Sequence, residues 1–337
     1  MVSGTTSLIG RTASQNLRLR NLNLQLQDLQ RQLSSQKKHA SFTGFDTEAF
    51  RIQDLRATSD RISVYQNNID RVKTRVELTL DSVTQIRDIA AEVEDSILIQ
   101  TREGEVDIER INTIADANLR FLQDLLNTQD GTRNILAGTD SQTPPFESFT
   151  NLINNFDNEI SDWLDGTQTV NDLFTNVESF TDTDLGLSAS LSSAGSVSTR
   201  IDEQVTVDFS VLANEEGFKN IIKGLALAQA VQFPDEAVDI GTESEFHQIL
   251  NQSVDYIRTG LDQLQDINAR VSSELNLILG VEENNARDFN LAEGLIAEKE
   301  QIDTAEAIVN IQNLETQLTA SYEVTRLTSE LSLVNFL

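Results

Sequence analysis

Both ends of this 337-residue chain carry narrow apolar stripes whose members are alternately three and four residues apart. The N-terminal stripe consists of Leu19, Leu22, Leu26, Leu29 and Leu33. The C-terminal stripe begins with Ile311, Leu314 and Leu318 and resumes after a slip with Ala320, Val324, Leu327, Leu331 and Val334. Such spacing is typical of a coiled-coil seam, which is narrower than the buried face of a globular helix. Because neither helix can bury its own stripe, we expect the two ends to pair with each other or with copies of themselves.

The sequence between the stripes favours a mainly helical protein. The chain has only 3 prolines and 6% aromatic residues, so helix breakers are scarce. Apolar residues at helical spacing predict helices over residues 7–36, 47–100 and 106–128, and from 242 to the C-terminus with a break near Gly280. These long segments predict helices that pack side by side.

The middle of the chain has a different pattern. Apolar residues from Phe146 to Trp163 predict a short helix, and residues 214–233 predict another that Pro234 ends. Apolar and polar residues alternate from Leu185 to Val211, which predicts two or three strands around a turn at 192–196. We therefore expect a mainly α fold: terminal coiled-coil helices at 1–40 and 300–337, a helical bundle at 41–140 and 243–299, and a small α+β domain at 141–242.

The charge is unevenly distributed. Of the formal net charge of −29, residues 1–40 contribute +5, from six Lys and Arg against one Asp, while residues 134–257 contribute −18, from 21 acids against three bases. An acidic middle indicates a solvated surface and argues against nucleic acid as the main partner. The basic N-terminal segment could be a nucleic-acid or membrane arm, but its regular leucines favour a helix pair instead. No apolar run approaches the length of a transmembrane helix, so we expect no membrane insertion.

Motifs that carry chemistry are missing. The chain has no cysteine and two histidines, His39 and His247, so a zinc site lacks ligands. The segment from Asp182 to Gly186 partly resembles the start of a calcium loop but lacks the remaining ligands, and we interpret it as an acidic turn. There is no zinc-protease, phosphate-loop or hydrolase motif. We therefore expect no cofactor, no metal and no enzymatic activity.

Four segments together resemble the flagellin superfamily, and most closely the flagellar hook-associated junction proteins of the FlgL type. They are Leu29–Lys38, Gly131–Phe146, Arg200–Phe218 and Thr316–Leu337. The first segment departs from the family pattern at Gln36, where the family usually has glycine. No single segment is specific, whereas their order and spacing are.

The resemblance implies an architecture and a role. The two chain ends would form a coiled coil at the inner wall of a hollow tube, with a helical second domain and a variable outer domain. The chain would be exported unfolded through the flagellar type III channel without a cleaved signal peptide. Its place would be extracellular, at the hook–filament junction, where it adapts hook to filament.

The same resemblance implies the partners and leaves alternatives open. The partners would be copies of the chain, the neighbouring hook-associated protein, flagellin and a flagellar export chaperone. The functional residues would be the two seams. The chain could also be filament flagellin itself or, in another class, a free coiled-coil adhesin or binding protein.

Overall fold

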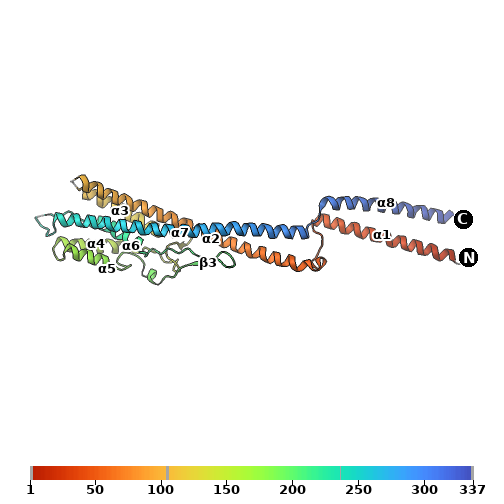
Figure 1. Ribbon diagram of the computed structural model, residues 1–337, viewed down its shortest axis with the longest axis horizontal. Helices are drawn as coiled ribbons and strands as arrows, with labels where there is room; N and C mark the ends of the chain where they lie inside the picture. Colours follow the sequence, from red (N-terminus) through yellow and green to blue (C-terminus); the bar gives the residue numbers. More distant parts are fainter. Residues whose placement is uncertain (1–2, 104–105, 236, 335–337) are drawn as a thin grey trace. The chain divides into compact units, whose positions relative to one another are not determined.

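The computed structural model describes residues 3–103, 106–235 and 237–334, including the side chains of 13–101, 106–235 and 237–327. The fold is mainly helical, as the sequence predicts (Figure 1). The helices are α1 (Ser3–Ser35), α2 (Glu48–Glu103), α3 (Ile108–Leu126), α4 (Phe149–Leu164), α5 (Val170–Ser179), α6 (Glu216–Ala230), α7 (Glu243–Glu300) and α8 (Thr304–Val334), with 3-10 turns η1 (Phe42–Phe45) and η2 (Ala189–Ser193). Two small hairpins complete the described part, β1 (Gln129–Asp130) with β2 (Arg133–Asn134) and β3 (Ser198–Arg200) with β4 (Thr206–Asp208).

The predicted helix break near Gly280 is wrong. Helix α7 continues through this residue to Glu300, and a Cβ atom on Gly280 would meet nothing within 4 Å. A single glycine on an open helix surface weakens a helix without ending it. The helix ends instead at Gln301–Asp303, where Asp303 caps α8 by accepting hydrogen bonds from the backbone of Ala305 at 2.8 Å and Glu306 at 3.1 Å.

The predicted strands at Leu185–Leu191 are also absent from the described structure. Leu185 and Leu187 are buried, but so are Gly186 and Ser188, so burial does not alternate as it would along a strand with one buried face. The chain turns here because Gly186 has a φ of +76°, and a Cβ atom at this position would lie 2.6 Å from the carbonyl oxygen of Ser148. The hairpin forms later, where Thr199 is the register partner of Val207.

The chain divides into two compact units. The central unit is Val64–Asn285, and the terminal unit is Met1–Ser63 with Ala286–Leu337. Residues 141–242 belong to the central unit and share one continuous hydrophobic core with its long helices. The expected division of the chain into three domains therefore stays a proposal.

Helix α6 is the centre of the central unit. It contacts both α3 and α4, and nearly all of its residues are buried, including Phe218, Ile221 and Leu225. Gly224 lets α6 approach α7 closely, since the Ser253 hydroxyl on α7 donates to the Gly224 carbonyl at 2.7 Å. Burial of apolar area around α6 thus stabilises this unit.

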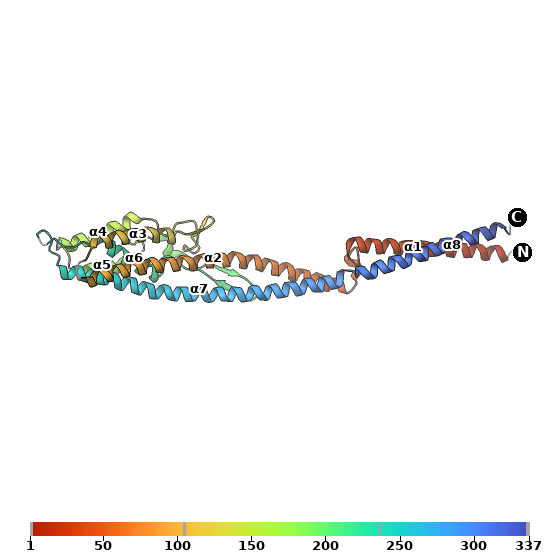
Figure 2. The same cartoon turned by 90° about the horizontal axis from the view of Figure 1, so that it is seen from above.

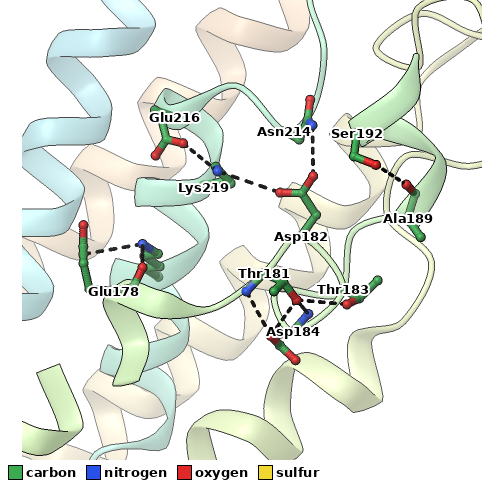
Figure 3. A network of polar contacts seen from close by, with 11 residues as sticks. Glu178, Thr181, Asp182, Thr183, Asp184, Ala189, Ser192, Asn214, Glu216 and Lys219 are labelled. Atoms are coloured by element: carbon green, nitrogen blue, oxygen red, sulfur yellow. Dashed lines mark hydrogen bonds and ion pairs between the residues drawn. The ribbon is translucent and has the colours of Figure 1, made fainter. Parts of the chain in front are cut away.

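A polar network ties the 181–186 turn to α6 (Figure 3). Asp182 accepts a hydrogen bond from Asn214 at 2.9 Å and lies 3.8 Å from the ammonium of Lys219, which also pairs with Glu216 at 2.6 Å. Asp184 instead accepts from the backbone and hydroxyl of Thr181. The two carboxylates are therefore occupied in holding a turn, in agreement with the interpretation from the sequence.

Candidate functional site

The two ends of the chain pair with each other. Helices α1 and α8 lie side by side in both views, and the N- and C-termini are at the same end of the pair (Figures 1 and 2). The pair is antiparallel, because the Asn23 amide donates to the Tyr322 hydroxyl at 3.3 Å while Lys37 forms a backbone bridge with Gln301. The pairing of the two ends is one of the two arrangements that the sequence left open.

The N-terminal stripe and the first part of the C-terminal stripe lie between the two helices. Leu22 on α1 and Leu318 on α8 are buried. The other members of these sections are half-buried: Leu19, Leu26, Leu29, Leu33, Ile311 and Leu314. A two-helix pair cannot enclose its own seam fully, which is why most of these side chains keep part of their surface in contact with solvent.

The later part of the C-terminal stripe leaves the seam: Val324 lies at the edge of the groove between α1 and α8, and Leu327 lies on the far side of α8. Val324 and Leu327 are 52% and 46% exposed. Leu327 follows Leu318 by nine residues, about two and a half helical turns, which places it on the opposite side of α8. Val309, nine residues before Leu318, is exposed on that same side. The slip in the stripe therefore marks a change of helix face, and the side chain of Leu331 lies outside those that the structure describes.

Helix α1 has a comparable outer face. Leu17 and Leu24 are seven residues apart, so they share one side of the helix, and both are exposed. This side is turned away from Leu22. Each terminal helix thus presents apolar side chains that its partner within the chain does not cover.

The seam between α1 and α8 becomes polar towards the chain ends. Ser321 and Thr325 follow Leu318 at positions where a heptad would place apolar residues, and the Thr325 hydroxyl donates to the Ser321 carbonyl at 2.7 Å. A groove of about 200 Å³ opens here, lined by Gln15, Arg18, Leu19, Ala320, Ser321, Val324 and Thr325. Little apolar area is buried along this part of the pair, so the pair alone is weakly stabilised there.

The other end of the pair is held by a polar clamp. The Lys38 backbone N–H donates to the Glu300 carbonyl at 2.8 Å, and the Ile302 N–H donates to the Gln36 carbonyl at 3.2 Å. The Glu300 carboxylate is buried and accepts hydrogen bonds from the Arg56 guanidinium on both oxygens, at 2.7 and 2.8 Å, with Lys37 3.8 Å away. These contacts fix the loop after α1 against the junction of α7 and α8.

Sequence reasoning missed this clamp. Arg56 and Glu300 are 244 residues apart, and neither belongs to a motif. The start of α8 could have been predicted, however. Glu306 follows Asp303 by three residues, which is the spacing of a helix-capping pair.

The described residues contain no group of three or more His, Cys, Asp or Glu side chains that could hold a metal ion. His39 stacks edge-on against Phe45 at 4.7 Å, and His247 lies 3.9 Å from Glu243. No helix within the described ranges is long and apolar enough to cross a membrane. What the terminal helices offer is packing surface and hydrogen bonds.

No protein-family model matches the chain, and no curated protein matches it. Among solved structures, one similar chain is a protein from Vibrio parahaemolyticus assigned to the flagellar hook-associated proteins, with 14% identity and a TM-score of 0.44 over 74% of this chain and 96% of that one. Another is FlgL from Bacillus cereus, with 14% identity and a TM-score of 0.44 over 72% of this chain and 99% of that one. Similarity at this level assigns neither a family nor a role, so the functional proposal depends on the chain's own residues.

Proposed function

We propose that this chain is a structural subunit of the bacterial flagellum, a hook-associated protein at the hook–filament junction that assembles through α1 and α8. The observation that carries the proposal is the exposed apolar face on each terminal helix, represented by Leu17 and Leu24 on α1 and by Val309 and Leu327 on α8. The four sequence segments that resemble the junction proteins support the flagellum as the structure in which the chain assembles.

The physical basis is a helix pair that needs neighbours. Apolar side chains on the outer faces gain about 25 cal/mol for each Å² that a neighbouring helix covers. Contacts between two different faces extend along an assembly instead of closing into a dimer. We infer that the seam residues, from Leu19 to Leu33 and from Ile311 to Leu331, order fully when subunits come together.

The remaining parts of the proposal follow from this role. The partners are copies of the chain, the neighbouring hook-associated protein, flagellin and an export chaperone, and the location is the extracellular flagellum after export in an unfolded state. Residues 141–242 would form the outer domain of the subunit. We propose no catalytic activity, because the terminal helices offer packing surface without reactive groups.

Electron microscopy of the purified protein with isolated hook tips and with filament seeds tests the proposal. A junction protein forms short caps on hook tips and does not extend seeds. Long filaments would identify the chain as flagellin instead, and soluble protein that ignores both structures would favour a free coiled-coil adhesin or binding protein.

A further inference from the structure

The most exposed large apolar side chains among the described residues do not lie on the terminal helices. They are Phe50 at 84%, Val238 at 79% and Ile240 at 69% exposure. Phe50 lies in the first turn of α2, and the other two lie between α6 and α7. Exposed apolar residues of this size that gather in particular loops indicate contact surfaces.

Phe50 belongs to an aromatic loop, which we define as residues 36–51. Phe42 in the same loop is also exposed, and its ring centroid lies 6.5 Å from that of Phe45. The Arg56 guanidinium lies 5.0 Å from the centre of the Phe42 ring. Since the polar clamp already fixes this loop to α7 and α8, its aromatic side chains are presented from a well-anchored backbone.

The second surface is an acidic loop, which we define as residues 231–245. Its backbone is also anchored: the Ile240 N–H donates to the Leu164 carbonyl at 2.8 Å, and Asp235 and Asp239 close a turn through a 2.8 Å hydrogen bond. Phe233 stacks edge-on against Phe246 at 5.0 Å and remains half exposed. Val238 and Ile240 are thus exposed next to anchored backbone, and the Ile240 side chain lies over Gly166.

The two loops are complementary in charge as well as in apolar surface. The aromatic loop carries Lys37, Lys38 and Arg51 against Asp46 and Glu48, a net charge of +1. The acidic loop carries five acids and no base, a net charge of −5: Asp235, Glu236, Asp239, Glu243 and Glu245. Opposite charges around apolar centres favour one pairing of surfaces and disfavour the pairing of like surfaces.

We propose that the aromatic loop of one copy docks onto the acidic loop of a second copy. Phe50 would pack against Val238 and Ile240, while Arg51 would face the acids around them. Each copy has both loops and the two differ, so the contact is heterologous and can repeat from copy to copy. The inference rests on the proposed function in that it assumes an assembly of identical subunits, and it adds a contact separate from α1 and α8.

Disulfide trapping in the full-length protein tests the contact, since the chain has no cysteine of its own. Phe50→Cys and Val238→Cys proteins are prepared separately, mixed and oxidised mildly. We expect the mixed cross-link to form at least about tenfold faster than the one between Val238→Cys and Val64→Cys, an exposed control position on α2, because docking raises the effective concentration of the two thiols. Equal rates, or faster Phe50→Cys homodimers, would overturn the proposal.

A second experiment tests the heterologous geometry with blocked variants. In Phe50→Asp the aromatic loop is disabled and the acidic loop is intact, whereas Val238→Asp has the opposite defect. By sedimentation velocity each variant alone should show self-association at least about tenfold weaker than the unmodified chain. Their mixture should form 1:1 dimers that do not extend, because one intact pair of surfaces remains. A mixture that behaves like either variant alone would contradict the docking scheme.

The two proposals can fail separately. If the cross-link forms but the protein never caps hook tips, the contact between the aromatic and acidic loops is supported as self-association, and the flagellar role is contradicted. If the protein caps hook tips while the cross-link forms no faster than the control, the flagellar role stands and the loop contact falls.

Discussion

Arg56 holds the buried carboxylate of Glu300 through both oxygens, at 2.7 and 2.8 Å, across 244 residues of sequence. The carboxylate lies at the last residue of α7, one position before the chain leaves this helix for α8. Both hydrogen bonds come from the same nitrogen, Nη2 of Arg56, and hydrogen bonds between charged partners are stronger than neutral ones. The Arg56–Glu300 contact therefore anchors the helix pair at one end, where the loop after α1 meets the junction of α7 and α8.

Removing the arginine should loosen this anchor. Arg56→Ala leaves the Glu300 carboxylate buried with only the more distant Lys37, so the free energy of local opening should fall by about 2 kcal/mol. The value is below that of a fully buried pair because Arg56 is itself partly exposed. Hydrogen exchange measures the effect directly, since the amides of Lys38 and Ile302 bond across the junction and should exchange faster.

The matched control is Arg56→Lys, which retains the charge and loses the planar guanidinium that also lies over the Phe42 ring. It should give intermediate exchange rates at the same amides. Unchanged rates in Arg56→Ala would show that the backbone hydrogen bonds hold the junction without the clamp.

Gln36 offers a test in the same loop. Its backbone has a φ of +56°, which costs a residue with a Cβ atom about 1–2 kcal/mol relative to glycine. Gln36→Gly should therefore stabilise the loop by up to about 1 kcal/mol after the larger entropy loss of glycine is subtracted. Slower exchange of the Ile302 amide, which donates to the Gln36 carbonyl, would show this.

Gln30→Gly serves as the control, because Gln30 lies within helix α1 and has no positive φ. There glycine should destabilise by about 1 kcal/mol. If both substitutions destabilised the terminal helices equally, the left-handed conformation would not limit the stability of the loop.

The close approach of α6 and α7 predicts opposite effects of alanine at two helical glycines. A Cβ atom on Gly224 would lie 2.6 Å from Cγ1 of Ile257 and 2.8 Å from the Ser253 carbonyl oxygen, and the latter is backbone that cannot move easily. Gly224→Ala should therefore destabilise the central unit by about 2 kcal/mol despite the better helix propensity of alanine. Thermal unfolding followed by circular dichroism measures the change.

Gly280→Ala is the control within the same protein. A Cβ atom there meets nothing within 4 Å, so alanine should stabilise α7 by up to about 1 kcal/mol. A destabilised Gly280→Ala protein would show that α7 is interrupted at this residue after all.

These glycines also show how far sequence reasoning could reach. Helical spacing over long segments predicted the mainly α fold, because burying an apolar face requires the same period along the whole helix. The spacing could not distinguish Gly280 on an open surface from a helix break, since that depends on what surrounds the residue. The alternation of apolar and polar residues also predicted a strand at Leu185–Leu191. A tight turn that buries two leucines two residues apart has the same alternation in sequence.

The candidate site was partly predictable for a similar reason. Leu22 and Leu318 could be assigned to a seam from spacing alone, whereas Leu327 has the spacing of the same stripe and lies on another face of α8. The face of α8 that meets α1 continues from Leu318 through Ser321 and Thr325. Because these side chains are polar, hydrophobic spacing does not reveal that they belong to the seam. The contact between Arg56 and Glu300 had no local signal at all.

Tyr256 predicts how the central unit responds to alkaline pH. Burial raises the pKa of its phenol, and the nearby Glu178 carboxylate, which accepts its hydrogen bond at 3.0 Å, raises the pKa further. Because this pKa is higher in the folded chain than the unfolded value of about 10, the neutral phenol stabilises the fold fully below about pH 10, and this contribution is lost as the pH rises above it. Denaturant unfolding between about pH 8 and pH 11 should show the loss.

Tyr256→Phe should remove this part of the alkaline destabilisation, because phenylalanine has no proton to lose. Glu178→Gln should retain most of it, since burial is the larger cause of the shift. A Tyr256→Phe protein with the same pH dependence as the unmodified chain would assign the alkaline loss to other groups.

The two faces of α8 can be separated by paired substitutions. Leu318→Asp places a carboxylate between α1 and α8, so the helix pair should open and exchange its amides faster even in the free subunit. Leu327→Asp changes an exposed side chain and should leave both the pair and its solubility intact, yet it should prevent incorporation at hook tips, because the proposed assembly covers that face. Electron microscopy scores incorporation and hydrogen exchange scores pairing. If Leu327→Asp subunits incorporated normally while Leu318→Asp subunits did not, the outer face of α8 would have no part in assembly, and the pair itself would be the only requirement.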